Sequence, residues 1–153
     1  MLATLPKRVS AMRKMQHLLD SKKPGVVSIA SDAPVIDALR LMAEHRIGAV
    51  LVMDAGKLAG ILSERDYARK VVLLGRTSAN TPVREIMSQQ VVCGRLADTV
   101  SHSMQVMTEK RIRHLPIVEH KEVVGIVSIG DLVKAIIEEQ QVELQHLQDY
   151  IVG

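Results

Sequence analysis

The sequence predicts a mixed α/β (α+β) fold made of two copies of one strand–helix–strand–strand–helix unit. Three observations lead to this prediction. The chain matches itself at an offset of 65 positions, each copy has a helical apolar pattern followed by two β-branched runs, and 153 residues suffice for two small units. We expect the copies to pack sheet to sheet, because one hairpin with two helices is marginally stable alone.

The internal match covers most of each copy. GILSERD at 60–66 and GIVSIGD at 125–131 share glycine, isoleucine, serine and aspartate at the same spacing, and the register holds back to Val27 and Val92 without an insertion. Pairs of identical and chemically similar residues at this density indicate a tandem repeat.

The segment before the first copy is expected to form an amphipathic helix, because Met12, Met15, Leu18 and Leu19 fall on one face. The first 16 residues carry basic side chains and no acid, a composition that a transit peptide also has. No apolar run follows them, so a secretory signal is excluded.

Each copy then begins with a short extended stretch, VVSIA or QVVCG, followed by a helix. Two β-branched runs come next and predict a hairpin: AVLVMD and LAGILS around residues 55–57, and LPIVE and VVGIVS around residues 120–121. Ser63 and Ser128 stand where an N-cap is expected, before the helical segments ERDYARKVVLL and IGDLVKAIIEE. The apolar residues that predict the first helix of each copy are Val35, Leu39 and Met42, and Val100, Met104 and Met107.

The last helix is expected to continue to about Ile151, well past the repeat. Its apolar side chains indicate either a docking or dimer face or packing on its own domain. They are Val133, Ile136, Ile137, Leu144, Leu147 and Ile151. The expected divisions are an N-terminal helix at 1–23, a first copy at 24–73, a polar linker at 74–85, a second copy at 86–140 and a helical extension at 141–153.

Composition restricts the classes of function. A formal net charge of +3, with the basic residues spread along the chain, gives little support to nucleic-acid binding. No apolar run approaches the roughly 20 residues that span a bilayer, so we expect no membrane segment and a cytoplasmic location. The lone Cys93 excludes an internal disulfide and is expected to be a small buried hydrophobe. With two Tyr and no Phe or Trp, a planar ligand must be held by aliphatic or arginine side chains.

The repeated serine and aspartate have two interpretations. Serine at an N-cap with aspartate three residues later is close to a capping box, which needs no ligand. The end of a strand that leads into a helix also collects backbone N–H groups that bind phosphate, and Ser63 and Ser128 add a hydroxyl there. The carboxylates of Asp66 and Asp131 can accept hydrogen bonds from both hydroxyls of a ribose. Together these groups describe a nucleotide site in each copy.

Basic and apolar residues near the motifs extend this hypothesis. Solvated charge is the usual role of a basic run, but Arg65, Arg69, Arg113 and His114 stand beside the motifs and are candidates for phosphate contact. A base could lie against an apolar strip in each copy. The strip comprises Ile47, Gly48 and Ala49 in the first copy and Ile112, Leu115 and Pro116 in the second.

These residues resemble the CBS (cystathionine β-synthase) domain, and the tandem is similar to a CBS pair, or Bateman module. The resemblance covers roughly residues 24–140 and is carried by IGAVLVMD and LAGILSERD in the first copy and by IRHLPIVE and VVGIVSIGD in the second. It implies two repeats related by a pseudo-twofold axis, with two clefts that take AMP, ADP, ATP, NAD or S-adenosylmethionine.

Further expectations follow from the resemblance. It implies that Asp66 and Asp131 bind ribose, that Ser63 and Ser128 lie on the phosphate side, and that the protein forms a homodimer. The clefts should differ, because the first copy has Gly48-Ala49 where the second has Arg113-His114, and Ser28 corresponds to Cys93. Ser28 therefore offers a hydroxyl to one cleft only.

Two other classes of function compete with an adenine-nucleotide sensor. An enzyme has little support, because the chain has no HExxH, GxSxG, P-loop or paired-cysteine motif and no metal-ligand spacing of histidines. The alternative is an interaction scaffold whose nucleotide clefts no longer function. We expect a non-catalytic module without metal that binds an adenosyl effector and signals to an effector protein whose identity the sequence does not specify.

Overall fold

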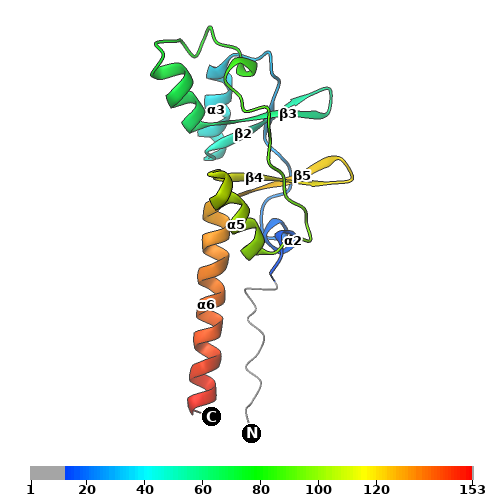
Figure 1. Ribbon diagram of the computed structural model, residues 1–153, viewed down its shortest axis with the longest axis vertical. Coiled ribbons are helices and arrows are strands. Elements are labelled where there is room, and N and C mark those ends of the chain that lie inside the picture. The colour runs from blue at the N-terminus through cyan, green and yellow to red at the C-terminus, as the bar shows by residue number, and fades with distance from the viewer. Residues whose placement is uncertain (1–12, 153) are drawn as a thin grey trace. The chain divides into compact units, whose positions relative to one another are not determined.

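β-branched runs and two-residue turns build two β-hairpins in the computed structural model, which describes residues 13–152 (Figure 1). In the first copy, β2 (Ala49–Asp54) pairs antiparallel with β3 (Lys57–Ser63). In the second, β4 (His114–Glu119) pairs with β5 (Glu122–Ser128). Both predicted hairpins are confirmed. The turn residues all have positive φ, as the tight turns that match strand twist require: Ala55, Gly56, His120 and Lys121.

The chain divides into two units, of which the first is the contiguous segment 25–92. Its sheet has the order β1-β2-β3, with β1 (Ser28–Ile29) parallel to β2. Helix α3 (Val35–His45) follows β1, and α4 (Glu64–Tyr67) follows β3. The short helix η2 (Val83–Glu85) ends the segment expected as a linker, where Val83 N–H donates to the carbonyl of Ala33 at 2.8 Å.

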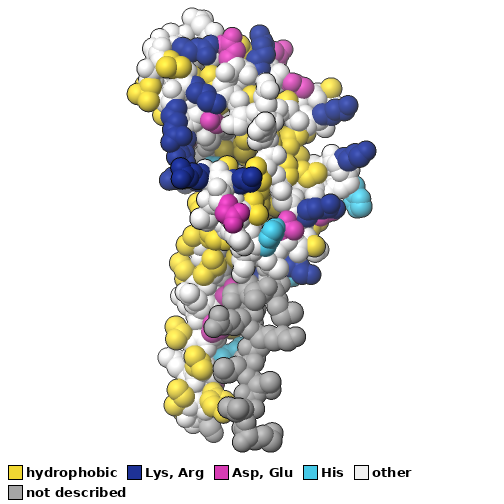
Figure 2. Space-filling model, viewed as in Figure 1, with side chains coloured by type: hydrophobic (Ala, Val, Ile, Leu, Met, Phe, Trp, Pro, Cys, Tyr) yellow, Lys and Arg dark blue, Asp and Glu magenta, His cyan; other side chains and the backbone are white. Residues whose placement is uncertain are grey.

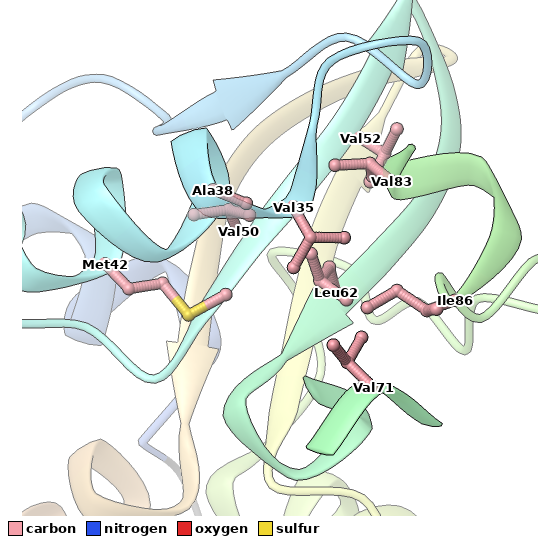
Figure 3. Packing of buried hydrophobic residues seen from close by; sticks show 9 residues of the cluster. All are labelled: Val35, Ala38, Met42, Val50, Val52, Leu62, Val71, Val83 and Ile86. Atoms are coloured by element: carbon pink, nitrogen blue, oxygen red, sulfur yellow. The ribbon is translucent and has the colours of Figure 1, made fainter. Parts of the chain in front are cut away.

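Aliphatic side chains from every layer of this unit meet in one core (Figure 3). Val35 and Met42 come from α3, Leu62 from β3 and Ile86 from the residue directly after η2. The buried members of this core are all aliphatic or methionine side chains, and Tyr67 packs against them from the edge. Its buried members are Val35, Ala38, Met42, Val50, Val52, Leu62, Val71, Val83 and Ile86.

The second helix of the first copy differs from the prediction of one α-helix over ERDYARKVVLL. Only Glu64–Tyr67 is α-helical, and η1 (Ala68–Val72) is a π-helix in which Leu73 N–H donates to the carbonyl of Ala68 at 3.1 Å. The apolar run at 71–74 is too continuous for one helical face. As a result Val71 is buried, while residues 72–74 are exposed.

The other unit joins residues 93–153 with the N-terminal segment up to Pro24. It contains α2 (Met15–Asp20), α5 (Val100–Lys110), the β4–β5 hairpin and α6 (Ile129–Val152). The N-terminal helix is shorter than expected, and both Met12 and the transit-peptide interpretation concern residues 1–12, outside the described range. Buried residues of this unit include Met15, Leu18, Val100, Met107, Leu115, Ile117, Val127 and Leu132.

The start of the second copy corrects two expectations. No strand forms over QVVCG, where Gly94 alone makes a bridge to Ile117. Cys93 is exposed instead of buried, although the adjacent Gly94 is hydrogen-bonded to β4 through both its N–H and its carbonyl. The expectation of a small buried hydrophobe was therefore wrong.

The segment that precedes each copy in sequence packs on the hairpin of the other copy. Residues 87–88 lie on β3, where Ser88 N–H donates to the carbonyl of Ile61 at 2.9 Å. Helix α2 lies on β5, where a methyl group added to Gly125 would be 2.6 Å from Cδ2 of Leu19. We call α2 and residues 87–88 the leader segments. Each of them lies in close contact with the motif glycine of the hairpin on which it packs.

Helix α6 reaches past the rest of its unit, as predicted. Its first turns bury Leu132 and Ala135, but residues 144–152 are exposed on every side. Yellow side chains mark this length of the helix in Figure 2. Among the described residues, no helix is both long and apolar enough to cross a membrane.

Candidate functional site

The motif of the first copy forms a reciprocal capping box at the start of α4. The amide N–H and the hydroxyl of Ser63 both donate to Oδ2 of Asp66, each at 2.9 Å, and the Asp66 N–H donates back to Oγ of Ser63 at 3.2 Å. The geometry matches the ligand-independent interpretation of the motif. It also fixes the Asp66 carboxylate, with 19% of the side chain exposed to solvent.

The second motif repeats this geometry at the start of α6. Ser128 N–H donates to Oδ2 of Asp131 at 2.8 Å, and Asp131 N–H donates to Oγ of Ser128 at 3.1 Å. Within residues 13–152, no hydrogen bond reaches the other carboxylate oxygen, Oδ1, of either Asp66 or Asp131. Each motif therefore holds one oxygen and leaves the other able to accept from a ligand.

A lysine lies beside each carboxylate, and neither was among the predicted site residues. Nζ of Lys70 is 3.6 Å from Oδ1 of Asp66. Nζ of Lys22 donates to Oδ2 of Asp131 at 2.7 Å and to the carbonyl of Ile126 at 3.0 Å. Lys70 stands four residues after Asp66, a spacing that could have identified it. Lys22 comes from the other end of the chain and leaves no local signal.

The charge near Asp131 changes its ionisation. Burial alone would raise the pKa of this carboxyl, but hydrogen bonds from Lys22 and the Ser128 amide, together with the Lys22 charge, hold it below its ordinary value. The group is therefore ionised at neutral pH and is a strong hydrogen-bond acceptor.

Several predicted residues lie next to their motif within the same unit. Ala49 is the ladder partner of Ser63, and Gly48 accepts a hydrogen bond from Glu64 N–H at 3.0 Å. His114 is the ladder partner of Ser128, and the Arg113 carbonyl accepts from Ile129 N–H at 2.8 Å. The structure thus brings together strand and motif within each copy.

The predicted arginines differ from the predicted apolar strip in exposure. Arg65, Arg69 and Arg113 are exposed, and no ion pair joins any of them to another residue of the described range. The strip is less accessible: Ala49, Leu115 and Pro116 are buried, whereas Ile47, Gly48 and Ile112 are half-buried. Ser28 is exposed on β1, opposite Leu51.

Comparison with known proteins identifies both copies. The family model described as "CBS domain" matches residues 22–73 and 83–138. The mitochondrial CBS domain-containing protein CBSX3 of Arabidopsis thaliana is 42% identical over 128 residues, which cover 80% of this chain and 62% of that protein. The chain therefore spans less than two thirds of this relative's length.

Solved structures share the fold across both copies. A putative signal-transduction protein with CBS domains from Burkholderia ambifaria has a TM-score of 0.81 at 42% identity, covering 83% of this chain and 96% of that one. The CBS domain pair of protein MJ0100, solved in complex with 5′-methylthioadenosine and S-adenosyl-L-methionine, has a TM-score of 0.72 at 25% identity. That match covers 84% of this chain and 98% of the other.

Proposed function

Because the chain belongs to the CBS domain family and carries two copies of that domain, we propose that it is a non-catalytic regulatory module that binds an adenosyl ligand. One observation carries the proposal. In both copies an aspartate is fixed by a capping box through one oxygen, while its second oxygen is open to a donor and a lysine stands beside it. A ribose diol and a phosphate are complementary to such a pair.

The proposal assigns a role to each predicted residue. Asp66 and Asp131 accept the ribose hydroxyls, and the apolar strips and Ser28 line the base. The ligand complex of the MJ0100 domain pair supports an adenosyl compound, and AMP, ADP, ATP, NAD and S-adenosylmethionine are the candidates. The proposed phosphate contacts are Ser63, Ser128, Arg65, Arg69, Arg113 and His114.

Isothermal titration with these five compounds tests the proposal. We expect at least one to bind, and Asp66→Ala or Asp131→Ala to weaken its own site about ten- to a hundredfold, because each removes charge-assisted hydrogen bonds. Asp149→Ala on the distal part of α6 is the control and should bind as the wild type does. The proposal would be contradicted if none of the five compounds bound to the protein. It would also be contradicted if the double variant Asp66→Ala, Asp131→Ala bound them with wild-type affinity.

Signalling requires a partner, and α6 offers a surface for one. The exposed apolar residues of its distal half suit a homodimer or an effector protein. The same face favours the alternative function, an interaction scaffold that binds no nucleotide. The titration above separates the two, because a scaffold would show no adenosyl binding while keeping its oligomeric state.

A further inference from the structure

A cavity of about 180 Å³ lies beside Asp131 within a single unit. One side is lined by Leu18 of α2 and by residues just before and after that helix, and one face of α6 lines the other. Its charged side chains are Arg13, Lys22, Lys134, Asp131 and Glu138. The cavity has room for a phosphate group and several waters.

The charges of this cavity do not cancel. Nη1 of Arg13 is 3.2 Å from Oε2 of Glu138, and Lys22 pairs with Asp131 at 2.7 Å. No ion pair joins Lys134 to any residue between 13 and 152. The lining thus carries one positive charge in excess, which attracts an anion.

Lys22 can bind an anion without leaving Asp131. Its ammonium group has three N–H donors. Two of them are used, by Oδ2 of Asp131 and the carbonyl of Ile126. The third is available to a ligand oxygen, and Oδ1 of Asp131 is available to a ligand hydroxyl. One ligand with an alcohol and a nearby anionic group satisfies both.

We propose that this cavity is the anion subsite of the second copy, and that Lys22 and Lys134 make this copy select phosphorylated adenosyl ligands over uncharged ones. The inference rests on the proposed function and adds the ligand's charge. It also distinguishes the two copies. The residue 65 positions after Lys22 is Met87, so the lysine beside the first copy's aspartate comes from a different place: Lys70 lies 3.6 Å from Oδ1 of Asp66 and donates to the carbonyl of Ile86 at 3.0 Å.

The test compares AMP with 5′-methylthioadenosine, which has the same base and ribose but no phosphate. Titrations use the full chain with Asp66→Ala, so that the second copy dominates the signal. We expect Lys22→Gln to lower AMP affinity about tenfold, because one charge-assisted bond is lost, and to change 5′-methylthioadenosine affinity by less than about twofold. Lys134→Gln should act in the same direction.

Matched variants control for folding and for general charge. Lys23→Gln removes the adjacent lysine, which does not line the cavity, and should keep the AMP preference. Lys22→Arg should retain it as well. Equal loss of both ligands in Lys22→Gln, or no loss of AMP, overturns this inference while the proposed function stands. If the Asp66→Ala parent binds neither compound, this inference is overturned, and the titration of the unaltered chain with all five compounds decides the proposed function separately.

Discussion

At the scale of single residues, the two motif glycines are equivalent in sequence but not in surroundings. A methyl group at position 60 would lie 2.7 Å from the backbone oxygen of Ser88, whereas at position 125 it would meet only side-chain atoms of Leu19. A leucine side chain can relieve such a clash by changing its rotamer, whereas a backbone carbonyl can move only if the main chain shifts.

We therefore expect Gly60→Ala to destabilise the protein by about 1–3 kcal/mol and Gly125→Ala by clearly less. Urea unfolding of the two variants measures the difference. Equal losses would show that Leu19 is held as rigidly as the Ser88 backbone.

Asp131 predicts a pH effect through its lowered pKa. An acid whose pKa is depressed by folding adds stability above its unfolded value, near pH 4, and loses it as pH falls through the folded value. The stability difference between wild type and Asp131→Asn should be constant from pH 7 to pH 5 and shrink below about pH 4. Its size should be about 1 kcal/mol, because Lys22 is partly exposed and the pair is screened. A difference that grows with acidity would contradict the ion pair.

At the scale of elements, α6 carries a repeating apolar stripe. The spacing alternates between four and three residues, the pattern of a two-stranded coiled coil with one polar core position. Residues 144–152 extend beyond the buried part of their unit, and an exposed apolar stripe with this spacing favours a second helix as its partner. The stripe residues are Val133, Ile137, Gln140, Leu144, Leu147 and Ile151.

We expect the wild type to sediment as a dimer and the double variant Leu144→Glu, Leu147→Glu to sediment as a monomer. Charged residues at core positions would be desolvated without partners. His146→Glu, on the same turn but off the stripe, should leave the dimer intact. A dimer that survives the double variant would place the interface elsewhere.

The elements also show what sequence patterns can and cannot predict. The hairpins, α3, α5 and α6 followed from periodicity, and the capping boxes followed from the spacing of Ser63 and Asp66. The π-helix and the missing strand near Cys93 did not, because both depend on tertiary packing. Lys22 was missed for the same reason: its contact with Asp131 joins residues 109 positions apart.

At the scale of the whole molecule, each leader segment packs on the hairpin of the other copy. This arrangement determines which fragments of the chain contain all the residues of their hydrophobic core. Residues 25–92 include every member of their core cluster. A fragment of residues 93–153 lacks Met15 and Leu18, which are 0% and 5% exposed in the full chain.

A peptide of residues 13–24 should therefore bind the 93–153 fragment and raise its helical content and melting temperature. Loss of two buried side chains costs several kcal/mol, typically about 2–5 for each residue truncated to alanine. Circular dichroism with and without the peptide measures the effect, and a Met15→Ala, Leu18→Ala peptide is the control. A fragment that is fully stable alone would contradict the assignment of α2 to this unit.

The leader exchange also sets an order of events on the ribosome. Residues 25–92 emerge as an unbroken stretch and can close their core while translation continues. The residues of α2 are made before this stretch, but they pack on β5, which is synthesised about a hundred residues later. Helix α2 therefore cannot pack until most of the chain has been synthesised. Until the β4–β5 hairpin leaves the exit tunnel, Met15 and Leu18 of the nascent chain stay exposed to chaperones.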